Sequence, residues 1–235
     1  MNPLEGQPLS YLIGPENAPA VSGRVVEVPN DTGTLSHGGP MIAYCNLFDD
    51  GYSDQDAATR AFYGPYLHTS DTAQEYGEGQ IDPKGAGFER NLIDQFTRCK
   101  AKGFEYIEID NPDAYRLKDV LRAINIAYLH GLKVIAKNPG LGCDGDPADT
   151  IVSHSNVYGI IVEKGAGSAT SMNAMRWKAS RLTLPVWFVF FGSGYARGKA
   201  IANEIRAHKL PNMGVTYSSR GEYGNVIDLC VPNIF

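Results

Sequence analysis

Residues 106–138 read YIEIDNPDAYRLKDVLRAINIAYLHGLKVIAKN, which predicts a strand, a helix and a second strand in succession. A period of two puts Glu108 and Asp110 on one face of the first strand, whereas Ile107 and Ile109 face the other way. The helix is predicted by apolar residues spaced three and four apart, followed by a glycine that ends it: Leu117, Val120, Leu121, Ile124, Tyr128, Leu129 and then Gly131. A strand, helix and strand in this order form the repeating unit of a parallel sheet.

Similar units recur along the chain. Eight runs rich in Val, Ile, Tyr and Phe are expected to be strands: Tyr11–Ile13, Arg24–Val28, Met41–Leu47, Tyr106–Asp110, Lys133–Lys137, Tyr158–Glu163, Val186–Phe191 and Gly214–Ser218. From the fourth run onward their ends are spaced by about 27 residues, which accommodates one strand, one helix and two short loops. The spacing predicts an α/β protein with a (β/α)8 TIM barrel as a single domain over residues 1–235. A doubly wound open sheet is the structural alternative.

A long polar and aromatic stretch, from about residue 49 to residue 87, separates the third and fourth predicted strands. Loops of this length are usually lids or binding loops, and a poorly packed insertion is the alternative. Further helices are expected to begin near Pro147, to run from about Ser168 to Ser180, and to run from about Ala196 to His208. The tail at Val226–Val231 is a candidate ninth strand to which we assign no role.

Composition restricts the partners of this chain. Hydrophobic residues make up 43% and charged residues 20% of the 235 residues, which is ordinary for a globular protein. The net charge of −5, with acids and bases interspersed, argues against nucleic acid as a partner. No apolar run approaches the ~20 residues of a membrane span. The N-terminal MNPLEGQPLSYLIGP lacks the basic start and apolar core of a signal peptide, so a cytosolic or already processed chain is expected.

The four cysteines are Cys45, Cys99, Cys143 and Cys230. They are widely spaced and include no C-x-x-C pair, so free thiols are expected rather than a zinc or redox site. The five histidines show no spacing typical of metal ligands, and no P-loop or G-x-S-x-G pattern occurs. We therefore predict neither a metal nor an organic cofactor, and the sequence does not predict the oligomeric state.

Carboxylates end two of the predicted strands. Asp110 ends the fourth strand and Glu163 the sixth, and in a barrel the C-terminal ends of the strands carry the active site. A charge that faces inward costs free energy unless it has a partner or a task. Hydrolysis of a glycosidic bond uses two such acids: one protonates the leaving oxygen, and the other attacks the anomeric carbon or activates water. The alternative for each acid is structural, as a helix cap or in an ion pair.

Polar and aromatic residues end the strands beside these acids. Lys137 and Asn138 end the fifth strand, and Lys137 is expected to lower the pKa of Asp110 or to bind sugar hydroxyls. A structural ion pair with Glu108 is the alternative for Lys137. The third and eighth strands end in aromatic and amide residues, which suit stacking and hydrogen bonding to sugars but are as often core residues. The predicted substrate-binding set is Tyr44, Asn46, Glu108, Asn111, Tyr115, Lys137, Asn138 and Tyr217.

The stretches AKGFEYIEIDNPDAY (101–115) and AYLHGLKVIAKN (127–138) resemble the endo-α-1,4-polygalactosaminidase family of glycoside hydrolases. Barrels of that family carry Ala-Lys-Gly, then Glu-x-Asp-Asn-x-Asp-Gly-Tyr at strand four, then a Gly-Leu pair before Lys-Asn at strand five. The matching positions here are Glu108, Asp110, Asn111, Asp113, Tyr115, His130, Gly131, Leu132, Lys137 and Asn138. Ala114 stands where the family has glycine, and the resemblance covers about a sixth of the chain.

The resemblance implies a barrel, endo-acting hydrolysis of a galactosamine-containing polysaccharide, and Asp110 as one catalytic carboxylate. It implies that the glutamate ending strand six is the other, and Glu163 matches by position. It also implies an exported protein with carbohydrate as its partner. Two other functions remain open. One is a Schiff-base aldolase or lyase that uses Lys137, with the Gly192–Gly194 turn holding a phosphate. The other is a carbohydrate-binding barrel without catalytic activity.

Overall fold

Eight strands form one sheet in a computed structural model of the chain, in the order β1-β2-β3-β6-β7-β8-β9-β10. The structure describes residues 2–7, 9–11, 25–29, 39–45, 67–68, 80–81, 86–110, 112, 116–139, 147–163, 181–191, 194–210 and 212–218. All neighbouring strands of this sheet are parallel, so the predicted α/β class with a parallel sheet is confirmed. The strands are β1 (Leu9–Tyr11), β2 (Val25–Pro29), β3 (Met41–Cys45), β6 (Tyr106–Ile109), β7 (Lys133–Lys137), β8 (Val157–Glu163), β9 (Val186–Phe191) and β10 (Met213–Ser218).

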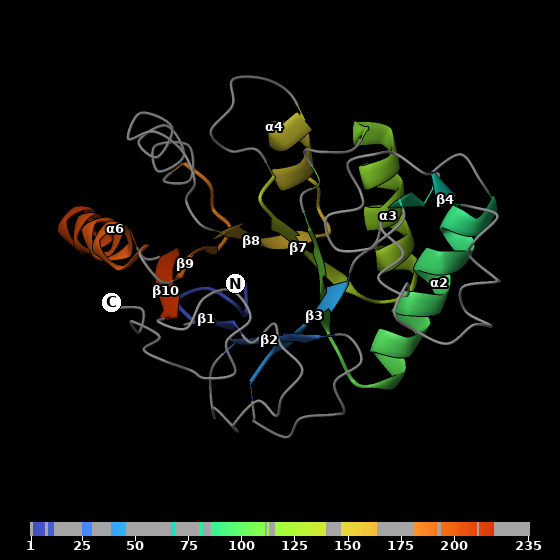
Figure 1. Ribbon diagram of the computed structural model, residues 1–235, viewed down its shortest axis with the longest axis horizontal. Helices are drawn as coiled ribbons and strands as arrows, with labels where there is room; N and C mark the ends of the chain where they lie inside the picture. The colour runs from blue at the N-terminus through green and yellow to red at the C-terminus, as the bar shows by residue number, and fades with distance from the viewer. Residues whose placement is uncertain are drawn as a thin grey trace.

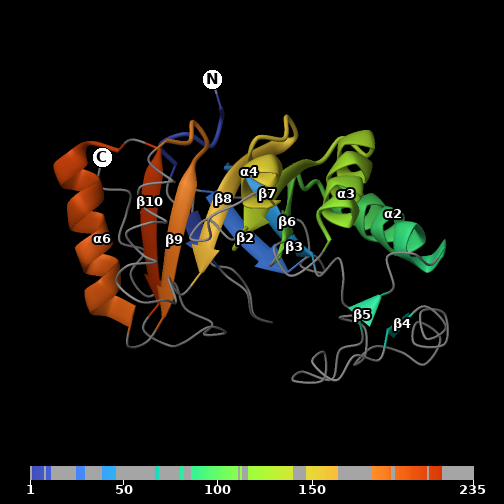
Figure 2. The same cartoon turned by 90° about the horizontal axis from the view of Figure 1, so that it is seen from above.

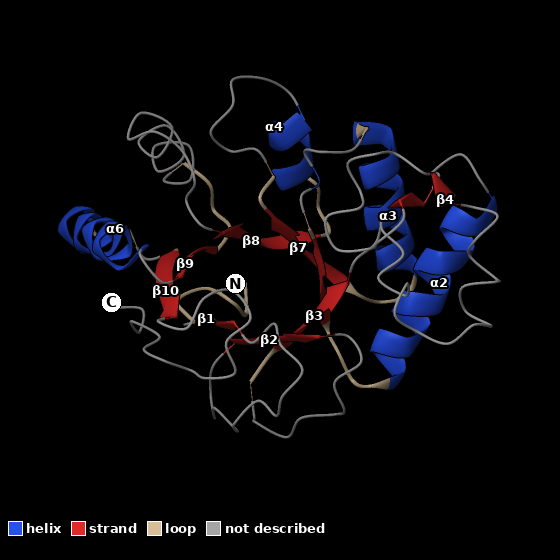
Figure 3. Ribbon diagram, in the orientation of Figure 1, coloured by secondary structure: helices blue, strands red, loops and turns tan. Residues whose placement is uncertain are grey.

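The helices lie outside the sheet, whose strands are arranged around a common centre (Figures 1 and 3). They are α2 (Ala86–Ala101), α3 (Leu117–Leu129), α4 (Pro147–Val152) and α6 (Tyr195–His208). Each helix is followed along the chain by a strand of the sheet, as the repeating unit requires. Among the described residues, every helix is too short or too polar to cross a lipid bilayer.

The stretch from residue 49 to residue 87 contains two short strands that the sequence did not predict. The short strands β4 (Leu67–His68) and β5 (Gln80–Ile81) pair antiparallel and lie apart from the main sheet (Figure 2). Most of this stretch, the predicted helix at 168–180 and the tail at 226–231 lie outside the described residues. Their predicted roles therefore stay predictions.

Most predicted boundaries agree with the structure to within one residue. The first strand differs: its pairing begins at Leu9, which is opposite Val25 of β2, whereas the prediction began at Tyr11. The third strand is described as far as Cys45, whereas the prediction ended at Leu47. In α3 the apolar stripe is confirmed at its centre, but Tyr128 and Leu129 are 67% and 79% exposed. Ala123, Ile124 and Ala127 hold the buried positions of the last two turns instead. Gly131 follows the helix with a φ of 67°, the left-handed conformation expected at a helix end.

The two faces of the sheet pack against different partners. Ile107 and Ile109 belong to a cluster between the sheet and the helices, whereas Tyr106 belongs to a cluster inside the sheet. The alternation predicted from the sequence of this strand is thereby confirmed. The inner cluster consists of Leu4, Leu9, Ile42, Tyr106, Ile135, Ile161, Trp187 and Val189. Burying a large apolar side chain of this kind contributes about 1.5–3 kcal/mol, so this cluster provides a stable interior beneath the strand ends.

The N-terminal residues 2–7 and the two outer strands complete this interior. Leu4 is fully buried, and the indole Nε1 of Trp187 donates a hydrogen bond of 2.9 Å to the carbonyl of Gln7. The strands β1 and β10, first and last in the sheet order, are in contact. Thr216 Oγ1 of β10 donates a hydrogen bond of 2.8 Å to the carbonyl of Leu9 in β1. The two edges of the sheet therefore lie side by side.

The pairing of β7 with β8 contains a register shift. Val134 is opposite Val157, but the next residue, Ile135, is opposite Gly159, so Tyr158 is an extra residue in β8. Such a shift changes which residues of a strand face which side, because side chains alternate with a period of two. After the shift Ile161 faces the interior cluster, and the last residue of β8, Glu163, follows it on the same face.

Substitution of Gly159 tests this arrangement. A Cβ atom at position 159 would lie 2.8 Å from Cζ3 of Trp187 and 3.2 Å from Cδ1 of Ile135. Gly159→Ala must therefore displace the indole, and we expect the free energy of unfolding to fall by about 1–3 kcal/mol. Denaturant unfolding followed by tryptophan fluorescence measures the change. An unfolding midpoint equal to that of the parent protein would contradict the close packing at this position.

Candidate active site

Four neighbouring strands carry the candidate site at their C-terminal ends. These are β3, β6, β7 and β8, which follow one another in the sheet, and because all are parallel their ends meet at one rim. Tyr44 comes from β3, Asp110 directly follows β6, and Lys137 and Glu163 are the last residues of β7 and β8. The structure therefore brings together residues that are more than a hundred positions apart in the sequence.

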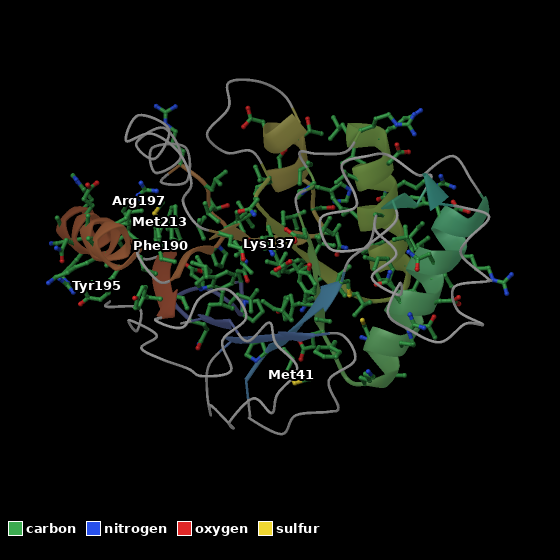
Figure 4. All side chains as sticks on the ribbon, viewed as in Figure 1. Met41, Lys137, Phe190, Tyr195, Arg197 and Met213 are labelled. Atoms are coloured by element: carbon green, nitrogen blue, oxygen red, sulfur yellow. The ribbon has the colours of Figure 1, made fainter. Side chains whose placement is uncertain are left out.

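The ammonium of Lys137 is the common partner of three carboxylates. Its Nζ lies 3.0 Å from Asp110 Oδ2, 3.5 Å from Glu108 Oε1 and 3.5 Å from Glu163 Oε2. The lysine side chain is only 4% exposed, and Figure 4 shows Lys137 near the centre of the molecule, among the strands. An ammonium has three N–H donors, which matches the number of carboxylates around it.

Two of the three carboxylates reach the surface. The side chains of Asp110 and Glu163 are 17% and 16% exposed, whereas that of Glu108 is not exposed at all. Since Asp110 Oδ2 is 3.0 Å and Glu163 Oε2 is 3.5 Å from the same nitrogen, these oxygens are at most about 6.5 Å apart. The two acids that the sequence singled out thus lie within reach of one small group, such as the two atoms of a glycosidic bond.

Burial dominates the protonation of Asp110. It raises the pKa of this carboxyl above its ordinary value, and the neighbouring charge of Glu163 acts in the same direction. The Lys137 ammonium and the hydroxyl of Tyr44 oppose the rise without cancelling it. The other oxygen, Asp110 Oδ1, is buried and accepts no hydrogen bond from the part of the chain that the structure describes. Asp110 therefore holds its proton to a higher pH than an aspartate in water does.

Asn138 fixes the backbone at Glu163. Its φ of 50° is the left-handed conformation that asparagine tolerates better than most residues. In this conformation the Asn138 N–H donates a hydrogen bond of 2.8 Å to the carbonyl of Ile161, and its Oδ1 accepts one of 2.8 Å from the N–H of Glu163. The ends of β7 and β8 are joined by these two contacts, which hold Glu163 beside Lys137.

Tyr44 contacts both charges at the rim. Its hydroxyl donates a hydrogen bond of 3.4 Å to Asp110 Oδ2, and its ring centre lies 5.1 Å from Lys137 Nζ. A cation at this distance from an aromatic ring is attracted to the electrons of the ring face. Tyr44 thus stabilises the ammonium and the ionised form of Asp110 together.

The predicted site residues have three outcomes. Tyr44, Asp110, Lys137, Asn138 and Glu163 lie together, as expected. Asn46, Asn111 and Tyr115 lie outside the described residues. The structure places the last two predicted substrate contacts, Glu108 and Tyr217, away from the open rim, so their contact with a substrate stays a prediction. Glu108 is fully buried beneath Lys137, and Tyr217 faces the helices, where its ring packs edge-on against Tyr195 with the ring centres 5.1 Å apart.

The residue pattern predicts contacts of Lys137 with Asp110 and, as an alternative, with Glu108, and the structure contains both. Two further contacts are not predicted from the sequence: Lys137 also reaches Glu163, and Asn138 accepts a hydrogen bond from the Glu163 backbone. Both contacts follow from the adjacency of β7 and β8, which the order of strands in a barrel would have indicated.

The two described cysteines, Cys45 and Cys99, are buried thiols that form no disulfide, and their sulfur atoms lie 3.5 Å apart. Cys143 and Cys230 lie outside the described residues. Within the described part of the chain, no group of three or more His, Cys, Asp or Glu side chains is arranged to hold a metal ion. Lys137 is the cation that the three carboxylates share in this structure.

Comparison with known proteins gives matches in structure only. No protein-family model and no curated protein sequence matches the chain. Ega3 of Aspergillus fumigatus, solved in complex with galactosamine, matches with a TM-score of 0.68 and 15% identity, over 96% of this chain and 95% of that one. The glycoside hydrolase domain of PelA from Pseudomonas aeruginosa matches with a TM-score of 0.65 and 14% identity, over 90% and 94% of the two chains. The chain has the fold of these proteins. The resemblance to polygalactosaminidase-like hydrolases is thereby confirmed, as a likeness of fold.

Titration of Asp110 tests the electrostatics of the site. We expect its pKa to lie above the ordinary value of an aspartate, and to rise further in Tyr44→Phe, because the variant removes a donor that stabilises the carboxylate. A carbon-13 NMR titration of the Asp110 carboxyl group measures both values. Tyr195→Phe, at an exposed position on α6, is the matched control and should leave the titration unchanged. A lower pKa in Tyr44→Phe would contradict the assigned contact.

Proposed function

We propose that this protein is an endo-acting glycoside hydrolase that cleaves a galactosamine-containing or related polysaccharide with Asp110 and Glu163. The observation that carries the proposal is that these two partly exposed carboxylates, from the ends of β6 and β8, converge on one ammonium. The fold shared with Ega3 in its galactosamine complex, and with the PelA hydrolase domain, supports both the reaction and the class of sugar. The proposed reaction needs no metal or organic cofactor.

The proposal includes a single closed (β/α)8 barrel as the framework of the site. Support comes from the contact between β1 and β10, the hydrogen bond from Thr216 to Leu9, and the inner cluster on the concave face of the sheet. In a closed barrel the strand ends surround one opening, so a sugar chain that lies across it meets both acids. We place all 235 residues in this one domain, with residues 49–87 as a long loop insertion.

In the proposed reaction one carboxyl group gives its proton to the glycosidic oxygen while the bond from that oxygen to the anomeric carbon breaks. The other carboxylate forms an ester with the anomeric carbon, and water then hydrolyses the ester and returns the proton. The raised pKa of Asp110 helps the site to hold one proton at the pH of the reaction. Lys137 stabilises the carboxylate that remains charged, and Tyr44 and Asn138 orient the acids and the sugar.

The Schiff-base alternative is disfavoured by the surroundings of Lys137. An amine attacks a carbonyl only in its neutral form. Three carboxylates within 3.5 Å stabilise the charged ammonium instead, and the lysine side chain is 4% exposed. A sugar-binding barrel without activity has the same fold and the same cluster, and the following experiment distinguishes it.

Removing either acid should abolish catalysis and leave the fold intact. Asp110→Asn and Glu163→Gln are expected to lower the release of reducing ends from partly deacetylated galactosamine polymer by at least about 10²–10⁴-fold. Asp110→Asn should be no less stable than the parent protein at pH 7. The raised pKa of Asp110 in the folded state stabilises the fold at low pH, where the carboxyl group is protonated, and this stabilisation is lost as the pH rises through that pKa. The side-chain amide of the variant stays neutral at every pH. Thermal unfolding measures this second effect.

Asp119→Asn is the matched control for these variants. Asp119 is a buried acid in the first turn of α3 and is paired with Arg116 at 2.7 Å. The control should lower the unfolding temperature and leave the release of reducing ends unchanged. If Asp110→Asn kept the activity of the parent, the assignment would be wrong. Binding of the oligosaccharide by the parent protein without any turnover would favour the sugar-binding barrel instead.

The stereochemistry of the reaction follows from the separation of the acids. Retaining glycosidases place their carboxyl groups about 5–5.5 Å apart and inverting ones about 6.5–9.5 Å apart, to leave room for a water molecule. The distance between Asp110 Oδ2 and Glu163 Oε2 is at most about 6.5 Å, so it can match the retaining range and reaches only the lower end of the inverting range. We therefore expect retention. Proton NMR of the anomeric signals in the first minutes of the reaction measures the outcome, and initial formation of the opposite anomer would show that the acids separate before reaction.

A further inference from the structure

Glu108 is an acid that the proposed reaction does not use directly. It lies on the same face of β6 as Asp110, one alternation deeper, and is fully buried. Tyr106 on its own strand and Ile135, its partner in β7, belong to the apolar inner cluster. Burying a carboxylate costs several kcal/mol unless an opposite charge compensates it. An apolar side chain would pack at this depth at a lower cost, so the carboxylate needs a reason to be there.

Its contact with Lys137 supplies the reason. Glu108 Oε1 lies 3.5 Å from Lys137 Nζ, from below, while Asp110 and Glu163 approach the same nitrogen from the rim. We propose that Glu108 is a positioning residue, which acts through Lys137 to keep the ammonium charged and centred between the two catalytic acids. This inference rests on the proposed hydrolase function and assigns Glu108 a role that neither substrate binding nor proton transfer requires.

The proposed reaction explains why such an anchor is useful. When one rim carboxylate becomes an ester, it loses its negative charge, and Lys137 loses one of its three charged partners. A lysine side chain has four rotatable bonds and is free to follow the remaining rim charge. Glu108 is too deep to form an ester with the sugar, so its contact with Lys137 persists through the reaction. The ammonium is then held in place to stabilise the rim carboxylate when it forms again.

The same contact affects proton binding at the rim. The groups that face Lys137 are Tyr44 from β3, Glu108 and Asp110 from β6 and its end, and Glu163 from β8. Neutralising Glu108 removes one negative charge from this group, so the ammonium of Lys137 is shared by two carboxylates instead of three. Asp110 should then lose its proton more easily, so its pKa should fall. A purely structural role of Glu108 would lower stability without this shift.

Glu108→Gln tests the inference, because it keeps the shape of the side chain and removes the charge. We expect the titration of Asp110, followed by carbon-13 NMR, to move to lower pH. We also expect kcat to fall by about ten- to a hundred-fold with little change in KM, because the substrate does not touch Glu108. The buried-acid control Asp119→Asn should change neither quantity. An unchanged Asp110 titration together with a parental kcat would overturn the proposal.

A double-mutant cycle shows whether Glu108 acts through Lys137. Lys137→Met removes the ammonium, and in that background Glu108→Gln should have no further effect on kcat. Effects that add independently would overturn the proposed path. If Glu108→Gln does not fold, Glu108→Asp is used in its place. Aspartate keeps the charge but is one methylene group shorter, so the carboxylate lies farther from Lys137, and kcat should fall by less than the amount expected for Glu108→Gln.

The NMR titration separates failure of this inference from failure of the proposed function. It needs no substrate and reads the contact between Glu108, Lys137 and Asp110 directly. If the parent protein cleaved no galactosamine polymer, the hydrolase proposal would fail while the titration still decided the positioning role. If the parent protein were active and Glu108→Gln left both the titration and kcat unchanged, only the positioning role would fail.

Discussion

The ammonium of Lys137 is the interaction on which the candidate site depends. It lies between the ends of three neighbouring strands, and each carboxylate around it comes from β6 or β8, the strands on either side. Two unit charges 4 Å apart interact by about 4 kcal/mol at the effective dielectric constant typical of proteins. Three carboxylates this close would repel one another by comparable amounts, so the cation between them makes their convergence possible.

The sheet places Lys137 where it can do this. Along β7 the inward residues are Ile135 and Lys137, an apolar side chain at depth and a charged one at the rim. The same gradient from apolar to charged occurs on β6, from Tyr106 through Glu108 to Asp110, and on β8, from Ile161 to Glu163. The apolar layer therefore serves as the floor of the charged layer, and residues 2–7 cover that floor from the other side.

Periodicity in the sequence was sufficient to predict the strands of the main sheet, the helices α3, α4 and α6 and the inward face of β6, whereas α2 was not predicted. It was not sufficient for β8, where strict alternation from Tyr158 would place Ile161 and Glu163 on the helix side. The register shift reverses this, because Tyr158 is an extra residue and Gly159, which has no side chain to displace Trp187, takes the next inward position. A one-residue irregularity of this kind depends on the packing of neighbouring strands and leaves no periodic signal.

The placements of Glu108 and Tyr217 show what the sequence of a strand leaves open. A strand sequence indicates which side chains share a face, but not how deep along the strand the solvent reaches. Glu108 shares the face of Asp110 and is nevertheless fully buried. Tyr217 lies near the end of its strand, but Met213 and Val215 place its face against the helices. Small residues, Gly214 and Thr216, occupy the inward positions of that strand, and this contrast in size was the signal available in the sequence.

The charged side chains at the rim lower the stability of the fold, whereas the apolar side chains beneath them raise it. This contrast supports a functional origin for the charged layer. The raised pKa of Asp110 means that its ionised form lowers the stability of the fold at neutral pH, and Glu108 adds the cost of a buried charge. Large side chains directly below, Tyr106 and Trp187, are fully buried and each contribute about 2–3 kcal/mol in the opposite direction. A sheet that needed only to be stable would extend the apolar layer to the rim. Placing charges there instead, around one shared ammonium, makes sense when the rim has chemistry to perform.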